Sequence, residues 1–149
     1  MTHAIRIHEH GGPEVLKWEA VDVGNPGEKE IRIRHTAIGL NYIDTYHRTG
    51  LYKIPLPTVI GREAAGVVDA VGSAVTDLKI GDRVAYAATP IGSYSEARLM
   101  AADRVVKIPA GVTDQQAASI MLKGITAQYL LRRTYPVKAG DTKIGRAHV

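Results

Sequence analysis

Short apolar runs, each about the length of one β-strand, recur along most of this 149-residue chain. Residues 4–7 and 30–35 alternate apolar and polar side chains, and Ile31 and Ile33 are expected to face inward. Turn-forming pairs such as Gly81-Asp82 separate one run from the next. Many short strands at this spacing predict a mainly β fold, in the form of a closed or partly open barrel. The other runs lie at residues 64–71, 83–87, 94–100 and 104–108.

One short helix is expected to interrupt these strands. It should extend from about Tyr42 to Thr49, because Asn41 can cap its start and Gly50 can end it. Asp44 and Arg48 stand one helical turn apart, so an ion pair between them is expected. Asp44 would then orient its neighbours instead of acting as a base.

The last part of the chain has a helical pattern. A helix is expected over residues 113–122, whose first four residues fit a capping box. Gly124 is expected to break this helix, and a second helix should follow at residues 126–134. The sequence therefore divides into a β-rich part, residues 1–112, and a helical segment, residues 113–142.

Residues 143–149 fit neither pattern. The last six residues contain no apolar run, and their back-translation resembles a sequencing-library adapter, so we expect this end not to be native. A divergent natural end is the alternative, and the DNA sequence of the locus would decide between the two.

Composition excludes several classes of function. The chain has no cysteine, so it can form neither a disulfide nor a thiolate metal site, and it has no cysteine nucleophile. No run approaches the roughly 18 apolar residues of a membrane helix, and the first residues lack the apolar stretch of a signal peptide, so a cytoplasmic protein is expected. The formal net charge of +4 comes from scattered basic residues, so nucleic-acid binding is not expected.

Several short motifs occur in an order and spacing that resemble one protein family. They are His10–Leu16, Gly39–Tyr46, Arg48–Tyr52, Gly61–Gly66, Lys79–Val84 and Leu122–Thr126. With these motifs, residues 3–142 resemble the N-terminal GroES-like domain of the medium-chain dehydrogenase/reductase superfamily. Within that superfamily, the motifs are similar to those of the NADPH-dependent, zeta-crystallin-like quinone oxidoreductases.

This resemblance implies a two-domain enzyme. The barrel would supply most of the substrate cleft, and a following Rossmann domain, which this sequence lacks, would bind NADPH at the N-terminus of a helix. The 149-residue chain alone is therefore expected to be inactive and to leave apolar helix residues exposed. The full-length protein is expected to form a homodimer and to take a small quinone as its substrate.

The same resemblance implies a reaction without zinc. Zinc members of the superfamily place a cysteine where Asn41 stands and a histidine where Arg62 stands, and neither an amide nor a guanidinium is a good zinc ligand. Without a metal, hydrogen-bond donors must polarise the quinone oxygen while NADPH supplies the hydride. No flavin is expected.

The candidate catalytic residues are side chains that can donate to a quinone oxygen, namely Tyr46, Tyr52 and Lys123. Their structural alternatives are packed tyrosines and a solvated lysine, while Asn41 could simply be a helix cap. Glu63 is expected to support the cleft from behind. By resemblance, the cofactor-contacting residues are Asn41, Tyr42, Ile43, Asp44, Thr45, Tyr46, Arg62, Lys123, Thr126 and Tyr129.

Two other functions stay open at this point. The same residues could reduce an enone or 2-alkenal instead of a quinone, because the missing domain would complete the substrate pocket. Alternatively, the barrel could be a non-catalytic GroES-like binding module.

Overall fold

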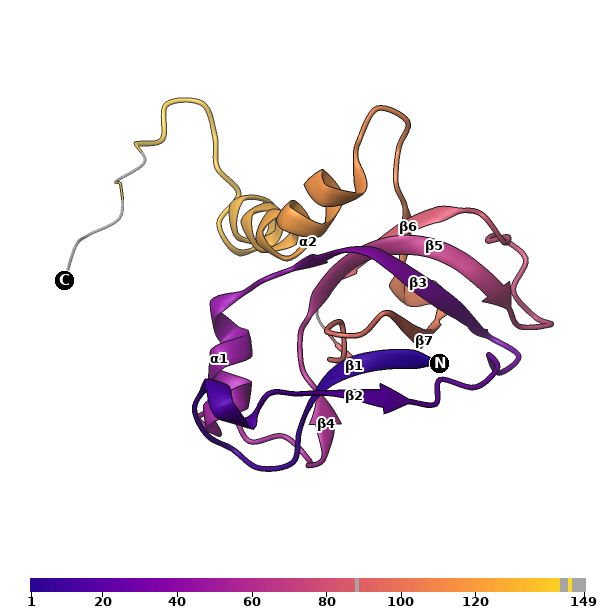
Figure 1. Cartoon of the computed structure of the whole chain (residues 1–149). Coiled ribbons are helices and arrows are strands. Elements are labelled where there is room, and N and C mark those ends of the chain that lie inside the picture. Colours follow the sequence, from indigo (N-terminus) through magenta and orange to yellow (C-terminus); the bar gives the residue numbers. More distant parts are fainter. Residues whose placement is uncertain (88, 143–144, 146–149) are drawn as a thin grey trace.

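The computed structural model of the chain describes residues 1–87, 89–142 and 145, and contains two antiparallel sheets (Figure 1). The smaller sheet has the order β2-β1-β4, with β1 at Thr2–Ile7, β2 at Lys17–Val21 and β4 at Thr58–Val59. The larger sheet has the order β7-β3-β5-β6-β8. Its strands are β3 (Glu30–Gly39), β5 (Glu63–Val71), β6 (Arg83–Ala87), β7 (Ala97–Ala101) and β8 (Val106–Lys107).

The two sheets meet along one seam beside β1. The backbone N–H of Ile5 donates to the carbonyl of Tyr94 at 2.7 Å, and the N–H of Glu96 donates to the carbonyl of His3 at 2.9 Å. Within the described residues the sheets do not close into a complete barrel. The mainly β, partly open barrel predicted from the sequence is therefore confirmed.

Several strand boundaries differ from the prediction. Strands β2 and β4 were not predicted, because β2 exposes most of its side chains and β4 is only two residues long. Strand β7 begins at Ala97, since the residues before it bond to β1 across the seam. The predicted strand at residues 104–108 is reduced to β8, because Ala102–Arg104 forms a 3-10 turn, η2. A second 3-10 turn, η1, covers Pro13–Val15.

The main core lies on the inner face of the five-stranded sheet. Ile31 and Ile33 of β3 are fully buried there, as the alternation of that segment predicts. Val68 of β5 and Tyr86 of β6 pack against them. This core fixes the register of β3, because a slip of one residue would turn its apolar side chains away from the core.

Helix α1 spans Tyr42–Thr49, in agreement with the sequence prediction. Asn41 precedes it in an extended conformation, and Gly50 ends it with a φ of 82°, a left-handed conformation that favours glycine. The helix begins immediately after β3 leaves the sheet, so it sits at the end of the larger sheet (Figure 1).

Helix α2 spans Asp114–Tyr129, and the predicted break at Gly124 is wrong. The capping box is confirmed, because the Gln116 N–H donates to Thr113 Oγ1 at 3.1 Å and the Thr113 N–H donates to Gln116 Oε1 at 2.9 Å. A single glycine costs a helix only about 1 kcal/mol, and packing of α2 on the sheet offsets that cost. A π-helical turn, η3, follows at Leu130–Thr134 where the second helix was expected.

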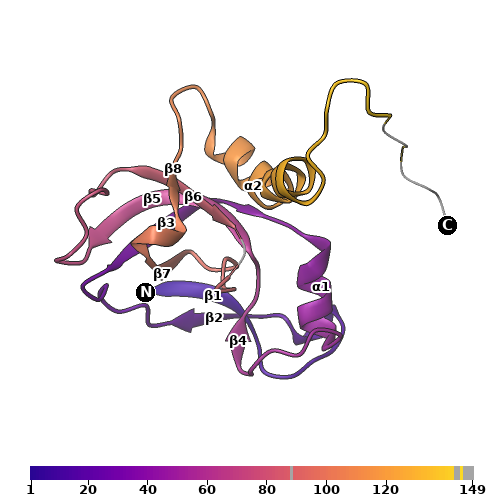
Figure 2. The same ribbon diagram turned by 180° about the vertical axis from the view of Figure 1, so that it is seen from behind.

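Helix α2 covers the outer face of β3, β5 and β6 (Figure 1), and Figure 2 shows the same arrangement from behind. Ala117 and Ala118 are buried against Ala65 and Ala85 of the sheet. These small side chains allow the helix to approach the strands closely.

Within the part of the chain that is described, no helix is both long and apolar enough to cross a membrane. The prediction about residues 143–149 concerns residues that, apart from Gly145, lie outside the described ones.

Candidate active site

Three polar side chains from distant parts of the sequence meet between α1, β5 and α2. The Asn41 Nδ2 group donates to Glu63 Oε2 at 2.8 Å, and the Lys123 ammonium donates to Asn41 Oδ1 at 3.0 Å. Lys123 Nζ also lies 3.7 Å from Glu63 Oε2. Asn41 is buried and Glu63 is fully buried, whereas 61% of the Lys123 side chain is exposed. We call Asn41, Glu63 and Lys123 the polar triad.

Each member of the triad is held by the local structure around it. Asn41 caps α1 through its backbone, because its N–H donates to Asp44 Oδ2 at 3.1 Å, and this leaves its side-chain amide for Glu63 and Lys123. Glu63 begins β5, and its backbone N–H donates to the buried Ser93 hydroxyl at 3.3 Å. Lys123 lies within α2.

A cavity of about 210 Å³ adjoins the triad between the end of β3 and α2. Leu40 lines it from the side of the sheet, and Gln115, Ser119 and Lys123 line it from the helix. Lys123, whose side chain is 61% exposed, therefore lines a small hollow that is open to a ligand.

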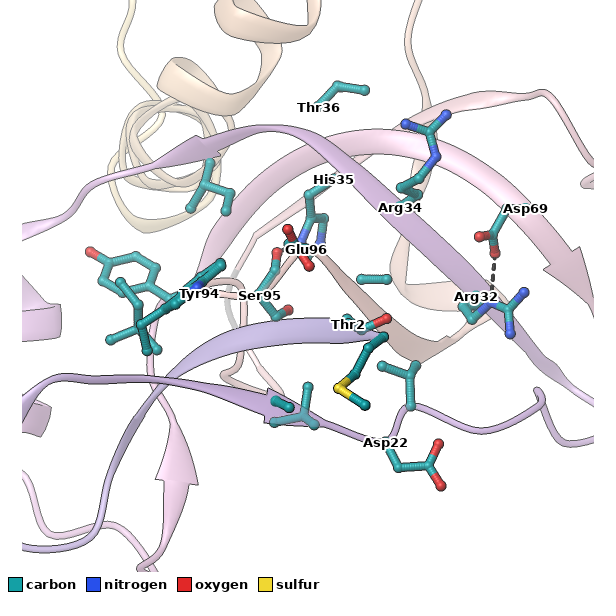
Figure 3. A pocket seen from close by; sticks show the side chains of 18 of the residues that line it. Thr2, Asp22, Arg32, Arg34, His35, Thr36, Asp69, Tyr94, Ser95 and Glu96 are labelled. Atoms are coloured by element: carbon teal, nitrogen blue, oxygen red, sulfur yellow. Dashed lines mark hydrogen bonds and ion pairs between the residues drawn. The ribbon is translucent and has the colours of Figure 1, made fainter.

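A larger cavity, of about 1460 Å³, lies between β2 and β3 (Figure 3). None of the site residues predicted from the sequence lines it. Of the charged groups along it, Arg32 and Asp69 are paired with each other, with Arg32 Nε 2.8 Å from Asp69 Oδ1. We therefore place the candidate active site at the polar triad and not in this larger groove.

Tyr46 and Tyr52, the tyrosines predicted as catalytic, form a cluster with Tyr42 on α1 and the loop after it. The rings of Tyr42 and Tyr46 meet edge to face at 5.2 Å, and those of Tyr46 and Tyr52 meet at 5.3 Å. Tyr46 is half-buried, while Tyr42 and Tyr52 are exposed. No hydrogen bond found among the described residues joins these phenols to the polar triad.

Asp44 does not pair with Arg48, so this sequence prediction is wrong. Asp44 Oδ2 accepts the Tyr94 hydroxyl at 2.9 Å, while Arg48 Nε donates to the carbonyl of Gly11. Burial raises the pKa of Asp44, although the hydrogen bonds from Tyr94 and the Asn41 N–H oppose this. Burial also lowers the pKa of the neighbouring His47. Asp44 therefore holds the start of α1 against the segment that contains Tyr94.

The remaining predicted cofactor contacts have local partners or none. Thr45 donates to the carbonyl of Tyr42 at 2.6 Å, and Thr126 donates to the carbonyl of Leu122 at 2.8 Å. Thr126 lies inside α2 and does not start a helix, because α2 is continuous there. Arg62 Nε is buried without a hydrogen-bond partner among the described residues. Ile43 is partly buried and Tyr129 is exposed.

His, Asp and Glu side chains within the described residues do not gather in threes that could hold a metal ion. A partly buried histidine, His35, lines the larger cavity and makes two hydrogen bonds through its ring. His35 Nδ1 contacts the carbonyl of Ser95 at 2.6 Å, and its Nε2 contacts the Tyr86 hydroxyl at 2.9 Å. Nδ1 must donate to the carbonyl, and when the ring is neutral Nε2 accepts from the Tyr86 hydroxyl.

Acidification is expected to destabilise the chain through His35. Burial, together with the nearby Arg98, lowers the pKa of His35 from 6.5 to about 4. Between these values the unfolded state binds a proton that the folded state does not, so stability falls as pH falls. The free energy of unfolding should decrease by up to about 1.4 kcal/mol per pH unit from this group.

Urea denaturation across this pH range would measure the effect, with His35→Gln as the variant that cannot titrate. The variant should have a flatter pH dependence than the natural chain. Equal slopes in the two proteins would contradict the assignment, and the remaining slope belongs partly to His47, whose pKa is lowered in the same direction.

The fold is that of a GroES-like domain of the alcohol dehydrogenase type. The family model for the alcohol dehydrogenase GroES-like domain matches residues 27–110, and the chain belongs to this family. It is 52% identical to the quinone oxidoreductase of Pseudomonas aeruginosa over 143 residues. The matched region covers 95% of this chain and 44% of that protein. It is 48% identical over 148 residues to the 2-haloacrylate reductase of a Burkholderia species, again over 44% of the relative.

Solved structures agree with these relatives. The quinone oxidoreductase of Pseudomonas syringae superposes with a TM-score of 0.90 at 50% identity, over 94% of this chain and 43% of that one. The Escherichia coli quinone oxidoreductase, solved as a complex with NADPH, superposes with a TM-score of 0.88 at 48% identity, over 93% and 42%. The resemblance predicted from the motifs is confirmed, and the chain spans about 44% of the length of the curated relatives.

Proposed function

We propose that this chain forms the catalytic part of an NADPH-dependent quinone reductase. The observation that carries the proposal is the polar triad, in which a buried amide and a buried carboxylate hold one exposed ammonium beside a small cavity. The quinone oxidoreductases among the relatives and the NADPH complex of the Escherichia coli protein support it.

The triad suits a reaction in which negative charge develops on an oxygen atom. NADPH, when bound, supplies the hydride. The Lys123 ammonium can donate a hydrogen bond to the quinone oxygen as its charge grows, and a fixed donor of this kind lowers the barrier. The hydroxyls of Tyr46 and Tyr52 are further donors on the neighbouring surface, and the faces of their rings can pack against a planar ligand.

We further propose that the reaction needs no metal. Both ends of the Asn41 side chain are already engaged, with Nδ2 on Glu63 and Oδ1 on Lys123. A cation placed at Asn41 would be repelled by the ammonium 3.0 Å away. Arg62, at the other position where zinc members carry a ligand, adds a second positive charge. We propose that no flavin takes part either.

The exposed surface of the helical segment fits a neighbouring domain. Ile120, Ile125, Tyr129, Leu130 and Leu131 are large apolar side chains that remain exposed on α2 and η3. Apolar side chains gathered in this way mark interaction surfaces. We propose that residues 1–112 form the catalytic barrel and that residues 113–142 lead to an NADPH-binding domain. The complete protein is proposed to be a homodimer.

Reduction of a conjugated acid, enal or enone is the second candidate. The observation in its favour is the 48% identity to the 2-haloacrylate reductase of Burkholderia, which equals the identity to the Escherichia coli quinone oxidoreductase. An electron-poor double bond conjugated to a carbonyl also develops negative charge on oxygen when it accepts hydride, so the same ammonium would serve.

A fusion protein separates these candidates. Residues 1–142 of this chain, joined to the remainder of the Pseudomonas aeruginosa quinone oxidoreductase, should oxidise NADPH faster with 1,4-benzoquinone than with an enone. The test is the ratio of kcat/KM for the two acceptors in steady-state assays. A strong enone preference would replace the quinone by the second candidate. Absence of turnover with both acceptors would favour a non-catalytic binding module.

A further inference from the structure

Glu63 connects three elements of the fold through a single carboxylate. Its Oε2 accepts from the Asn41 side chain before α1, and its Oε1 accepts from the backbone N–H of Leu122 in α2, each at 2.8 Å. The side chain itself belongs to β5 and has no exposed surface. A buried carboxylate that received fewer hydrogen bonds would be costly to keep, so both donors matter to it.

This arrangement decides which way the Asn41 amide points. An ionised carboxylate can only accept hydrogen bonds, and an ammonium can only donate them. The NH₂ group of Asn41 must therefore face Glu63, which leaves Oδ1 to face Lys123. The amide thus links the Glu63 side chain to the Lys123 ammonium through two hydrogen bonds.

We propose that Glu63 is a positioning residue, which orients the Asn41 amide and thereby holds the Lys123 ammonium at the mouth of the small cavity. Its effect on turnover rests on the proposed function, but its effect on Asn41 does not. Glu63 itself is fully buried and acts through Asn41, whereas Lys123 provides the exposed group.

The substitution Glu63→Gln would break this pair of hydrogen bonds, although the glutamine side chain has nearly the same shape as glutamate. The introduced amide keeps an oxygen on one side and carries an NH₂ group on the other, so one of the two groups that now donate to the carboxylate would face another donor. The Leu122 N–H is fixed in the helix backbone, while the Asn41 amide can rotate by half a turn. In Glu63→Gln, the Asn41 amide should therefore turn its Oδ1 toward the introduced NH₂ group, and the Lys123 ammonium, having lost its acceptor, should move away.

The side-chain amide resonances of Asn41 report this flip in the 149-residue chain. In Glu63→Gln they should shift, while the backbone amide resonance of Leu122 stays close to its original position. In Lys123→Met they should shift less than in Glu63→Gln, because the NH₂ group keeps its hydrogen bond to the carboxylate. Glu28→Gln, which removes an exposed carboxylate outside the site, is the matched control and should leave them unchanged.

In the fusion protein, Glu63→Gln should lower kcat about 10- to 100-fold with little change in the KM for NADPH. Unshifted Asn41 resonances in Glu63→Gln would overturn the proposal. Loss of the Leu122 hydrogen bond together with a lower Tm would also overturn it, because Glu63 would then only tie α2 to the sheet.

Should Glu63→Gln fail to fold, Lys123→Met decides alone, and loss there of the scalar coupling across the hydrogen bond from Asn41 Nδ2 to the Glu63 carboxylate would refute the inference. An unmodified fusion protein without activity would reject the proposed function, while the resonances would still decide the orientation of Asn41.

Discussion

Gly39→Ala is expected to lower the free energy of unfolding by about 2–3 kcal/mol, in line with overpacking in a dense core. A Cβ atom at Gly39 would overlap the carbonyl oxygen of Ala118 in α2 and lie 2.7 Å from Glu63 Oε2. The first of these neighbours is helix backbone, which can move only if α2 lifts from β3. The second belongs to the polar triad, so the substitution should also disturb the site.

A matched control, Gly124, lies in helix α2. At Gly124 the nearest atom to an added Cβ is Ile120 Cγ1 at 3.7 Å, an ordinary contact. Alanine there should stabilise the chain by about 0.5–1 kcal/mol, because it restricts the unfolded state and favours the helix. Urea denaturation of both variants measures the two effects. A Gly39→Ala protein as stable as the natural chain would mean that α2 does not rest on β3 at this point.

Helix α1 and strands such as β3 could be predicted because their signals are local. Ile31 and Ile33 alternate with charged residues over one segment, and Asn41 and Gly50 stand at either end of α1. Gly124 misled the prediction because the force that maintains α2 is not local. The helix is stabilised by the burial of Ala117 and Ala118 against Ala65 and Ala85, residues that are distant in the sequence.

The three members of the polar triad could be named from the sequence, but the contacts between them could not. Asn41 and Lys123 were named through the family motifs, but they are 82 positions apart, and no spacing rule brings them together. Glu63 was recognised only as support, although it is the group that both of the others contact. The bond from Tyr94 to Asp44 was missed, because Arg48 at helical spacing offered a simpler partner that the structure does not use.

Lys123→Met is expected to have the largest effect on activity, about a 100- to 1000-fold loss of kcat/KM for the quinone in the fusion protein. Methionine keeps an unbranched side chain of similar length but removes the ammonium that faces the small cavity. Stability should change little, because 61% of the Lys123 side chain is exposed. The loss should appear mainly in kcat, since the ammonium is needed most as charge develops on the quinone oxygen.

A second lysine provides the control. Lys79 is exposed in the turn before β6 and takes no part in the triad, so Lys79→Met removes the same charge without touching the site. It should leave kcat/KM within about twofold of the unmodified fusion protein, a change well below that of losing a catalytic donor.

The value of kcat/KM for 1,4-benzoquinone in Lys123→Met, measured beside Lys79→Met and the unmodified fusion protein, tests the central claim most directly. A loss of about 100-fold or more in Lys123→Met alone is the result predicted for a reductase whose polar triad presents the catalytic cation. Equal values in all three proteins would contradict it, and would move the active site away from Asn41, Glu63 and Lys123.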